Sequence, residues 1–434
     1  MVRPSDHLLA GLSGGIDSVV LLDILGRLAR KLRFRLSALH VNHQLSPHAR
    51  RWEAFCRRLC GARGIPFGSV RVGVRRGDSI EAAARAARHA AFARQPCDYV
   101  VLAHHRDDQV ETLLLQLLRG AGVKGLAAMP LLRDAGESSS LIPHPSSLRI
   151  LRPLLDTTRE EILEYAQARK LKWVEDESNQ DTYFQRNFIR HEVLPVVARR
   201  FPAYRATLAR AAGHLAEAAQ LLDELAAADA AGHLERGTLS IAALRRLPPA
   251  RGRNLLRYFV AFHGLTMPSA ERLHEALRQA LTAKQDARVL VELGDFTLRR
   301  HAGRLHLVPS RRTLPARFER LWRGEKKIAL PELGGVLTMP RARGAGIGLA
   351  RLRGRPLTIR LRRGGESLQP DCRRPRRSLK NLLQEAGVPP WERERLPLIF
   401  FGDKLVWAPG IGVDCGFQAP RGAPALRPAW MRSP

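Results

Sequence analysis

Short apolar runs and helically spaced apolar residues alternate along the first two hundred positions of the chain. The runs at His7–Leu12, Leu36–Val41 and Asp98–Ala103 have the length and composition of buried strands. In Ile16–Lys31 and Asp107–Arg119, apolar residues recur every three or four positions, which predicts helices with one buried face. This alternation predicts an α/β fold with a Rossmann-like parallel sheet covered on both faces.

Weaker signals complete this region. Further helices are predicted at Pro47–Arg63, Ile80–Arg94 and Thr157–Lys170, with short strands at Val70–Val72 and Leu148–Leu151. The N-cap candidates are Asp78 or Ser79 for the second of these helices and Thr157 or Thr158 for the third. A stretch rich in Ser, Pro and Gly at 134–147 is predicted to be a surface loop.

The pattern changes after about residue 195. Residues 204–282 carry long Ala- and Leu-rich helical stretches, and residues 289–308 alternate around two turns, which predicts a small hairpin or meander. From residue 313 onward, short strand signals lie among many Gly, Pro and Arg residues. We therefore predict three domains: α/β at 1–200, mostly helical at 201–312, and small α+β at 313–434.

Composition points to a polyanionic partner. The chain has 434 residues, with 72 basic and 41 acidic side chains and a formal net charge of +31. Such an excess repels itself in a compact state, and nucleic acid would compensate it. A compositional preference for Arg and Ala is the alternative and accounts for part of the excess. An apolar fraction of 45% excludes a disordered chain.

The cysteines are few and scattered, at Cys56, Cys60, Cys97, Cys372 and Cys415. None forms a CxxC pair, so we expect reduced thiols, as in a cytoplasmic protein. No secretory signal and no run of 18 apolar residues is apparent, so we expect no membrane attachment.

The turn between the first strand and the first helix predicts a phosphate site. It reads Ser13-Gly14-Gly15-Ile16-Asp17-Ser18. The glycines let phosphate oxygens approach the backbone, and the N–H groups of a helix start favour an anion. Asp17 would repel a bare phosphate, so we expect Mg²⁺ between the two. The alternative, a plain strand–helix turn, explains the glycines but not the whole pattern.

A second polar cluster, residues 104–112, follows the strand at Asp98–Ala103. Asp108 and Glu111 lie three positions apart on the following helix, so both face one side, where they would suit Mg²⁺ or an amine. His104, at the strand end, is placed to contact a phosphate. Asp107 is either an N-cap or functional, and His105 is expected on the surface.

The glycine-rich turn that ends this helix has two explanations. Gly120 or Gly122 would serve as a helix cap without any function. Arg119 and Lys124 beside them would alternatively allow a phosphate contact.

Together these motifs resemble the tRNA(Ile)-lysidine synthetase family, in its long three-domain form. The phosphate loop itself resembles the wider PP-loop class of N-type ATP pyrophosphatases. The N-terminal motifs are SGGIDS at 13–18, HVNH at 40–43, EAAARAARH at 81–89, AHHRDDQVET at 103–112, RGAGVKGLAAM at 119–129, RPLL at 152–155, EDESN at 175–179 and RNFIR at 186–190. The C-terminal motifs are RLRRGGE at 360–366, SLKNLLQEAGVPPWER at 378–393 and LVWAPGIGV at 405–413. Two positions depart from the family pattern, His89 in place of Tyr and Ala128 in place of Gly.

The resemblance implies a two-step reaction on RNA. The wobble cytidine of a tRNA(Ile) with a CAU anticodon is adenylated by ATP, and pyrophosphate leaves. The ε-amine of L-lysine then attacks carbon 2 of the base, and AMP leaves. Decoding changes from AUG to AUA. Positioning and charge stabilisation are the main tasks of such an enzyme.

The resemblance also implies roles for residues. The ATP-binding set is Ser13, Gly14, Gly15, Ile16, Asp17 and Ser18, and the catalytic set is Asp17, with Mg²⁺, His104 and Arg85. The lysine ammonium would lie on Asp108 and Glu111. The tRNA-binding set is Arg88, Arg186, Arg190, Arg362, Arg363, Arg373, Arg374, Arg376, Arg377 and Lys380.

Three alternatives are weighed against this interpretation. A tRNA thiolase would need paired reactive cysteines, and an amidotransferase-coupled synthetase would need a glutaminase domain. A non-catalytic tRNA-binding protein would have no use for an acidic residue in its phosphate loop. The sequence offers no paired reactive cysteines and no glutaminase domain in a recognisable form, and it does carry Asp17 in its phosphate loop.

Overall fold

The computed structural model describes residues 2–44, 46–73, 80–133, 149–284, 289–310, 317–352 and 356–432. The chain divides into two compact units, Met1–Lys284 and Gln285–Pro434. The predicted loop at 134–147 and the predicted cap at Asp78 or Ser79 lie outside the described residues. The boundary between the units falls inside the predicted middle domain, and the three-domain division stays a prediction.

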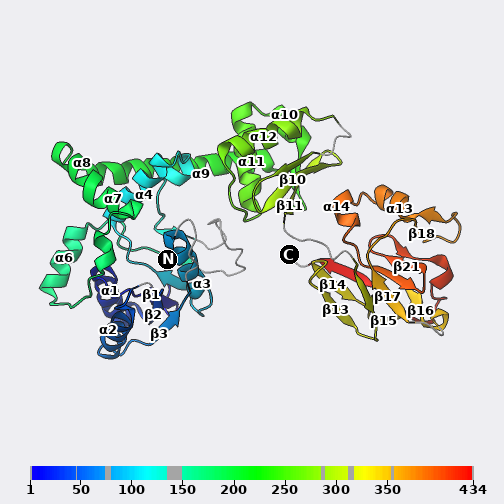
Figure 1. Cartoon of the computed structure of the whole chain (residues 1–434), viewed down its shortest axis with the longest axis horizontal. Helices are drawn as coiled ribbons and strands as arrows, with labels where there is room; N and C mark the ends of the chain where they lie inside the picture. The colour runs from blue at the N-terminus through cyan, green and yellow to red at the C-terminus, as the bar shows by residue number, and fades with distance from the viewer. Residues whose placement is uncertain are drawn as a thin grey trace. The chain divides into compact units, whose positions relative to one another are not determined.

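The first unit is built on a six-stranded sheet with the order β3-β2-β1-β4-β6-β5 (Figure 1). Its strands are β1 His7–Gly11, β2 Arg35–Asn42, β3 Phe67–Arg71, β4 Tyr99–Val101, β5 Leu132–Arg133 and β6 Arg149–Leu151. The first four strands and β6 run parallel, which confirms the prediction. The sequence analysis did not predict β5, which pairs antiparallel to β6 at the edge.

Both faces of this sheet are buried, because alternate residues of each strand point to opposite sides. Leu8 and Ala10 of β1 join a core with α1 Ile16–Leu32, α2 Ala49–Gly61 and α6 Arg159–Ala168. Leu9, between them, joins a second core with Phe92 of α3, which spans Ile80–Ala93. Because these strands run parallel, the carboxyl ends of β1, β2, β4 and β6 lie along one edge of the sheet.

Helices make up most of the rest of the first unit. They are α4 Arg106–Leu118, α5 Val123–Leu126, α7 Gln185–Phe188, α8 Leu194–Arg200, α9 Tyr204–Ala230, α10 Ile241–Arg246, α11 Pro249–Phe262 and α12 Ala270–Thr282. Short 3-10 and π turns occupy Glu177–Gln180 and Ile189–Val193, and the strands β7 Leu234–Glu235 and β8 Thr238–Ser240 form a hairpin. The predicted helical content of 204–282 is confirmed. Ala128 has a left-handed φ of 53°, a conformation that glycine adopts more easily.

The second unit is rich in antiparallel strands. A meander of β9 Leu290–Glu292, β10 Phe296–His301 and β11 Arg304–Pro309 confirms the prediction for 289–308. The following strands are β12 Glu319–Leu321, β13 Lys327–Leu330, β14 Gly335–Thr338, β15 Arg341–Arg343, β16 Ile347–Gly348, β17 Leu357–Arg360, β18 Ser367–Leu368, β19 Arg377–Ser378, β20 Leu398–Phe401, β21 Lys404–Ala408, β22 Gly412–Val413, β23 Pro424–Leu426 and β24 Ala429–Arg432. Two short helices, α13 Leu379–Glu385 and α14 Pro390–Arg393, accompany them, in agreement with an α+β fold.

The second unit also corrects one expectation about cysteines. Cys372 and Cys415 form a disulfide, with Cα atoms 5.4 Å apart, so the expectation of free thiols is wrong for this pair. The two residues are 43 positions apart, and spacing alone gave no sign of the pairing. Cys56, Cys60 and Cys97 are free.

The start of α6 offers a test of local folding. Thr158, one of two cap candidates, is the N-cap: its hydroxyl accepts from Glu161 N–H at 3.2 Å, and Glu161 accepts from Thr158 N–H at 2.6 Å. We expect Thr158→Ala to lower the free energy of unfolding by about 1 kcal/mol, because the Glu161 N–H loses its side-chain capping partner. Urea denaturation followed by circular dichroism measures this loss.

Thr157→Ala is the matched control, since the hydrogen bonds of Thr157 with other described residues run through its backbone. An equal loss in both variants would contradict the capping assignment.

Candidate active site

The phosphate loop lies between β1 and α1, as predicted. Gly14 N–H and the Ser13 hydroxyl both donate to Ser18 Oγ, each at 3.1 Å, and Ser18 donates to Gly15 O at 2.9 Å. Gly15 is the N-cap of α1 in an extended conformation, without a side-chain cap. The N–H groups at the start of α1 are therefore available to an anion.

Gly14 is held in place by residues far away in the sequence. Its φ is +95°, and its carbonyl accepts from Val174 N–H at 3.0 Å. A Cβ at this position would lie 2.9 Å from Val174 Cγ2 and 3.2 Å from Cys56 Sγ. Glycine is thus required here for both backbone conformation and space.

His40 of the HVNH motif contacts the backbone directly before the phosphate loop. His40 is buried, and its Nδ1 makes a 2.9 Å hydrogen bond with the carbonyl of Leu12, directly before the loop. Cys56 Sγ lies 3.8 Å from the same nitrogen. The motif therefore acts on the phosphate loop through its backbone.

Asp17 presents an unsatisfied oxygen at the start of α1. Its Oδ1 is buried without a hydrogen-bond partner, and burial raises the pKa of this carboxyl group. Its nearest cations are His105 Nε2 at 3.8 Å and Arg159 Nη1 at 3.7 Å. The described residues contain no group of three or more His, Cys, Asp or Glu side chains that would hold a metal alone. A hard cation such as Mg²⁺ fits this oxygen provided that phosphate oxygens supply other ligands.

His105 was expected on the surface, and this expectation is wrong. The residue is 1% exposed and lies among three carboxylates, with 3.8 Å to Asp17 and 3.6 Å to both Asp107 and Asp108. Burial opposes its charged form, but these carboxylates outweigh burial and raise the pKa of His105. A cationic imidazole here offsets part of the acidic charge.

Asp107 is not the helix N-cap, so the structural alternative for this residue is wrong. His105 is the N-cap of α4, and Asp108 closes the capping box by accepting from His105 N–H at 2.9 Å. Asp107 instead accepts hydrogen bonds from the side chain of Arg205 and from Arg159 N–H. Burial opposes its charge, but hydrogen bonds from His105, Arg205 and Arg159 hold the pKa of Asp107 well below its usual range. The sequence analysis missed Arg205 and Arg159, which lie far away in the chain.

Asp108 and Glu111 face one side of α4, as predicted, and there they meet two arginines of the RNFIR motif. Arg186 Nε lies 2.6 Å from Glu111 Oε2, and Arg186 Nη2 lies 2.7 Å from Asp108 Oδ1. Arg190 Nε binds Glu111 Oε1, also at 2.6 Å. Two buried carboxylates are therefore matched by two guanidinium groups. The predicted lysine-binding and tRNA-binding roles of these residues stay predictions. Either ligand would have to replace an ion pair between these carboxylates and guanidinium groups.

His104 keeps one ring nitrogen without a partner at the end of β4. Its Nδ1 is buried and makes no hydrogen bond. Burial lowers the pKa of His104 to about 3, so the ring is neutral near pH 7. A neutral imidazole with an unsatisfied nitrogen suits hydrogen bonding to a ligand.

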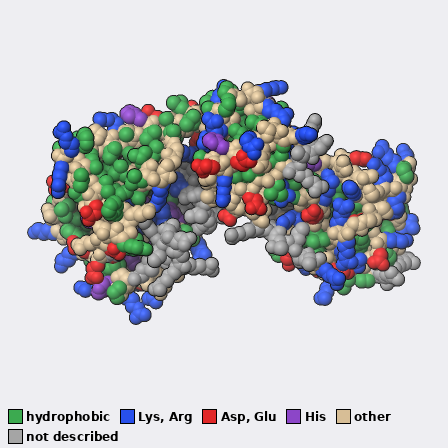
Figure 2. Space-filling model, turned by 45° about the horizontal axis from the view of Figure 1, so that its top comes forward, with side chains coloured by type: hydrophobic (Ala, Val, Ile, Leu, Met, Phe, Trp, Pro, Cys, Tyr) green, Lys and Arg blue, Asp and Glu red, His purple; other side chains and the backbone are tan. Residues whose placement is uncertain are grey.

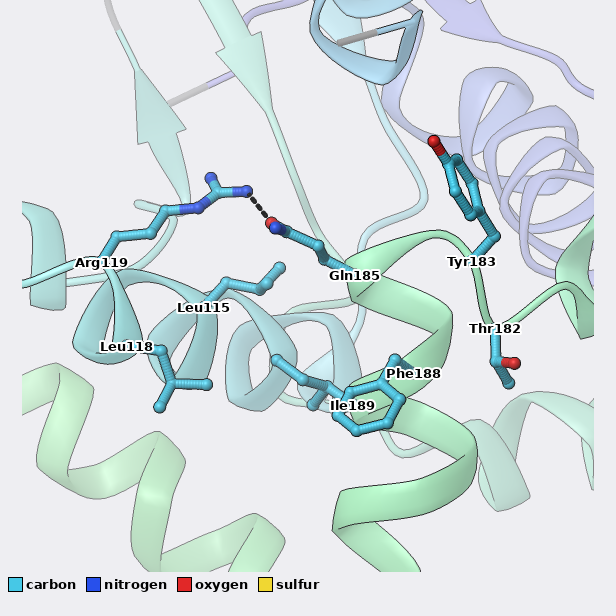
Figure 3. A pocket seen from close by; sticks show the side chains of 8 residues that line it. All are labelled: Leu115, Leu118, Arg119, Thr182, Tyr183, Gln185, Phe188 and Ile189. Carbon is cyan, nitrogen blue, oxygen red and sulfur yellow. Dashed lines mark hydrogen bonds between the residues drawn. The ribbon is translucent and has the colours of Figure 1, made fainter. Parts of the chain in front are cut away.

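A separate cavity of about 320 Å³ lies between α4 and the segment around α7 (Figure 3). Its walls are mainly apolar, with Leu115, Leu118, Phe188 and Ile189 among them. Apolar side chains also gather on one face of the first unit in Figure 2. Arg119, at the rim, donates to Gln185 Oε1 at 2.6 Å. These walls do not favour the phosphate contact considered for Arg119.

The glycine-rich turn after α4 is a helix end. Gly120 has a φ of 69°, and its N–H donates to Leu117 O at 3.0 Å, which confirms the capping alternative. Lys124 pairs with Asp223 of α9 at 2.7 Å.

The arginines predicted to bind tRNA in the second unit are already in ion pairs. Arg376 lies 2.9 Å from the buried carboxylate of Asp414, and Arg377 pairs with Glu385. Longer pairs of 3.5–3.6 Å are Arg362–Glu366, Arg363–Glu319 and Arg374–Asp371. Arg373 and Lys380 of the same predicted set are exposed. Their contacts with tRNA stay predictions.

A parallel sheet, a strand–SGGIDS–helix turn and a carboxylate with one buried oxygen at that turn define an ATP-binding protein of the PP-loop class. Sequence models of three domain families match the chain: "PP-loop domain" at 2–197, "TilS substrate binding domain" at 239–306 and "TilS substrate C-terminal domain" at 357–430.

Close relatives cover the whole chain. It is 47% identical to the tRNA(Ile)-lysidine synthase of Nitrosomonas europaea, over 100% of this chain and 93% of that protein. It is 41% identical to the tRNA(Ile)-lysidine synthase of Coxiella burnetii, over 94% and 89%. Among solved structures, the U34-tRNA thiolase NcsA from Methanococcus maripaludis aligns with a TM-score of 0.41 and 18% identity, over 50% of this chain and 74% of that one. The chain belongs to the tRNA(Ile)-lysidine synthase family. No helix among the described residues has the length and apolar character to cross a membrane.

Gly14→Ala tests the constraint on the phosphate loop. We expect it to lower the free energy of unfolding by roughly 1–2 kcal/mol, because the left-handed backbone is strained by a Cβ that also meets Val174. Thermal unfolding measures the change. Gly15→Ala is the matched control, since its Cβ would meet only Ser13 Oγ at 3.5 Å. A larger loss for Gly15→Ala would contradict this explanation.

A second test addresses the buried charges. We expect Glu111→Gln to cost about 3–5 kcal/mol, because it leaves two guanidinium groups without their buried partner. Adding Arg190→Gln should recover at least about 1 kcal/mol of that loss, since the two residues share one network. Urea unfolding of both single variants and the double variant gives the coupling energy. Additive losses would show that the pair is not coupled.

Proposed function

We propose that the chain ligates L-lysine to carbon 2 of the wobble cytidine in a tRNA(Ile) with a CAU anticodon, through an adenylated intermediate. Family membership carries the coarser statement: the chain is an ATP-dependent ligase that forms lysidine on tRNA(Ile). The choice of lysine, the CAU anticodon and Mg²⁺ belong to the proposal.

The observation that carries the proposal is the pairing of an anion site with an unsatisfied carboxylate. Free N–H groups at the start of α1 suit the pyrophosphate end of ATP, and the buried Oδ1 of Asp17 lies in the first turn of the same helix. When bound, Mg²⁺ would neutralise charge on the leaving pyrophosphate. A binding module without chemistry would gain nothing from an acid at this position.

The neighbouring strand end supports the next role. His104 is neutral and half-buried, and its unpartnered nitrogen lies at the carboxyl end of β4, next to β1. It is placed to hydrogen-bond the α-phosphate, where the cytosine carbonyl oxygen attacks. Arg85 of α3, which is exposed, would add positive charge beside the same phosphate.

The lysine site is proposed on Asp108 and Glu111. Both carboxylates are already charged and held on one face of α4, which suits an ammonium group. In this arrangement Arg186 or Arg190 would turn toward RNA phosphate as the amine arrives. One set of charges would then serve both substrates in turn.

The thiolase alternative finds no support in the thiols of the first unit. Cys56 and Cys60 are both 0% exposed, and burial raises their pKa values to about 12 and about 11. Neither is a nucleophilic thiolate near pH 7. The cytoplasmic location expected from the sequence stays a prediction.

Asp17→Ala tests the assignment. We expect pyrophosphate release to fall by roughly 10²-fold or more, because the metal ligand is lost at the reacting phosphates. The tRNA dissociation constant should stay within about twofold, since removing one carboxylate leaves the basic surface intact. The assay combines ATP, Mg²⁺, labelled lysine and a CAU-anticodon tRNA(Ile) transcript, and it follows label in RNA and pyrophosphate separately.

Two results would count against the proposal. Absence of lysine incorporation by the unaltered protein would remove the lysine ligation. A loss of tRNA affinity in Asp17→Ala as large as its loss of pyrophosphate release would remove the metal role of Asp17.

A further inference from the structure

Arg152 is a fully buried cation. It directly follows β6 and is 1% exposed. Its Nη1 donates to the carbonyl of Pro130 at 2.7 Å, whereas its Nε is buried without a hydrogen-bond partner. Among the described residues, no carboxylate lies in an ion pair with it. A buried guanidinium is stabilised by an anion close to it, and a ligand at this edge of the sheet can supply one.

The position of Arg152 places it on the ligand-binding edge of the sheet. β4 and β6 are parallel neighbours, with Val101 opposite Leu151, and Leu102 N–H donates to Leu151 O at 2.9 Å. Arg152 therefore stands beside the chain that leads from β4 to His104. Ligands of open α/β sheets bind at this carboxyl edge. The phosphate loop follows β1, which is two strands, or about 10 Å, from β6.

Other cations surround the same place. Arg85 and Arg88 from α3 and Arg133 from β5 act with Arg152 on His89: burial first, and then these charges, lower the pKa of His89 to about 3. Burial, followed by Arg133 and Arg85, lowers the pKa of Arg152 itself to about 10. These like charges come from three parts of the chain, and they would stabilise an anion bound beside Arg152.

We propose that Arg152 forms the floor of a second anion site, which binds a phosphodiester group of the tRNA beside the nucleotide that is modified. This inference rests on the proposed function. The triphosphate of ATP has its own site at the start of α1, so the attacking cytidine reaches the α-phosphate from the opposite side of His104. The phosphate next to that cytidine then lies over β6. Arg152 is a binding and positioning residue, and it takes no part in bond making.

Arg152→Gln is the main variant, because glutamine keeps an N–H donor for Pro130 O and removes the charge. Arg152→Lys keeps the charge. Arg149→Gln is the matched control on the same strand, where Arg149 Nη1 instead donates to Tyr99 Oη at 3.1 Å. Filter binding of the full tRNA(Ile) transcript at several salt concentrations, the KM for ATP in pyrophosphate release, and the melting temperature are measured for each.

We expect Arg152→Gln to weaken tRNA binding roughly tenfold and to reduce the salt slope by about one, as for loss of one phosphate contact. The KM for ATP should stay within about twofold. Arg152→Lys should recover most of the affinity, and Arg149→Gln should behave like the unaltered protein. Transcripts with single methylphosphonates in the anticodon loop should contain one position whose neutralisation weakens the unaltered protein but not Arg152→Gln.

Three outcomes would overturn the inference. A raised KM for ATP with unchanged tRNA affinity would assign the site to nucleotide phosphate. A lowered melting temperature with unchanged binding of both would make Arg152 a packing residue. Equal sensitivity of Arg152→Gln to every methylphosphonate would exclude a specific phosphodiester. Failure of the proposed function would appear separately, as absent lysine incorporation by the unaltered protein, because tRNA binding is measured without chemistry.

Discussion

The active-site region depends on the compensation of buried acidic charge at the start of α4. Asp107, Asp108 and Glu111 are all nearly inaccessible to water, a condition that costs several kcal/mol per ion unless each carboxylate has close donors. Arg186, Arg190 and Arg205 supply those donors, and all three come from one later segment of the chain. These ion pairs therefore join α4, which follows the parallel sheet, to the helical segment that begins near residue 186.

This compensation also shapes the chemistry. A carboxylate that is already ionised and oriented can receive an ammonium group without first losing a proton or a rotamer. The guanidinium groups that hold it are in turn the kind that bind phosphate in a fork-like geometry. If the proposed lysine and tRNA roles hold, each substrate would bind the charged side chains that the other substrate displaces from their ion pairs.

Local features of the sequence were sufficient for the strands, the helices and the phosphate loop. The SGGIDS turn, the shared face of Asp108 and Glu111, and the helical stretch at 204–282 follow from periodicity over a few residues. His105 was placed wrongly because its surroundings include Asp17, a residue 88 positions earlier that no local pattern connects to it. Arg205 and Val174 also contact the site from distant positions in the chain, so no local pattern predicts their contacts. In the sequence, Arg152 is recognisable only as part of the RPLL motif. Its burial and its unsatisfied Nε depend on neighbouring elements that only the structure shows.

The helix α9 connects the Asp107–Arg205 contact in the active-site region to helices outside it. Its first turn is fixed at Arg205, and Asp229 near its far end receives a hydrogen bond from Arg251 of α11 at 3.1 Å. A helix of 27 residues is about 40 Å long and nearly rigid, so it acts as a lever. A tilt of about 5° at the active-site end would displace the other end by roughly 3.5 Å. Small rearrangements around Asp107 can thus be transmitted mechanically to the helices that α9 carries.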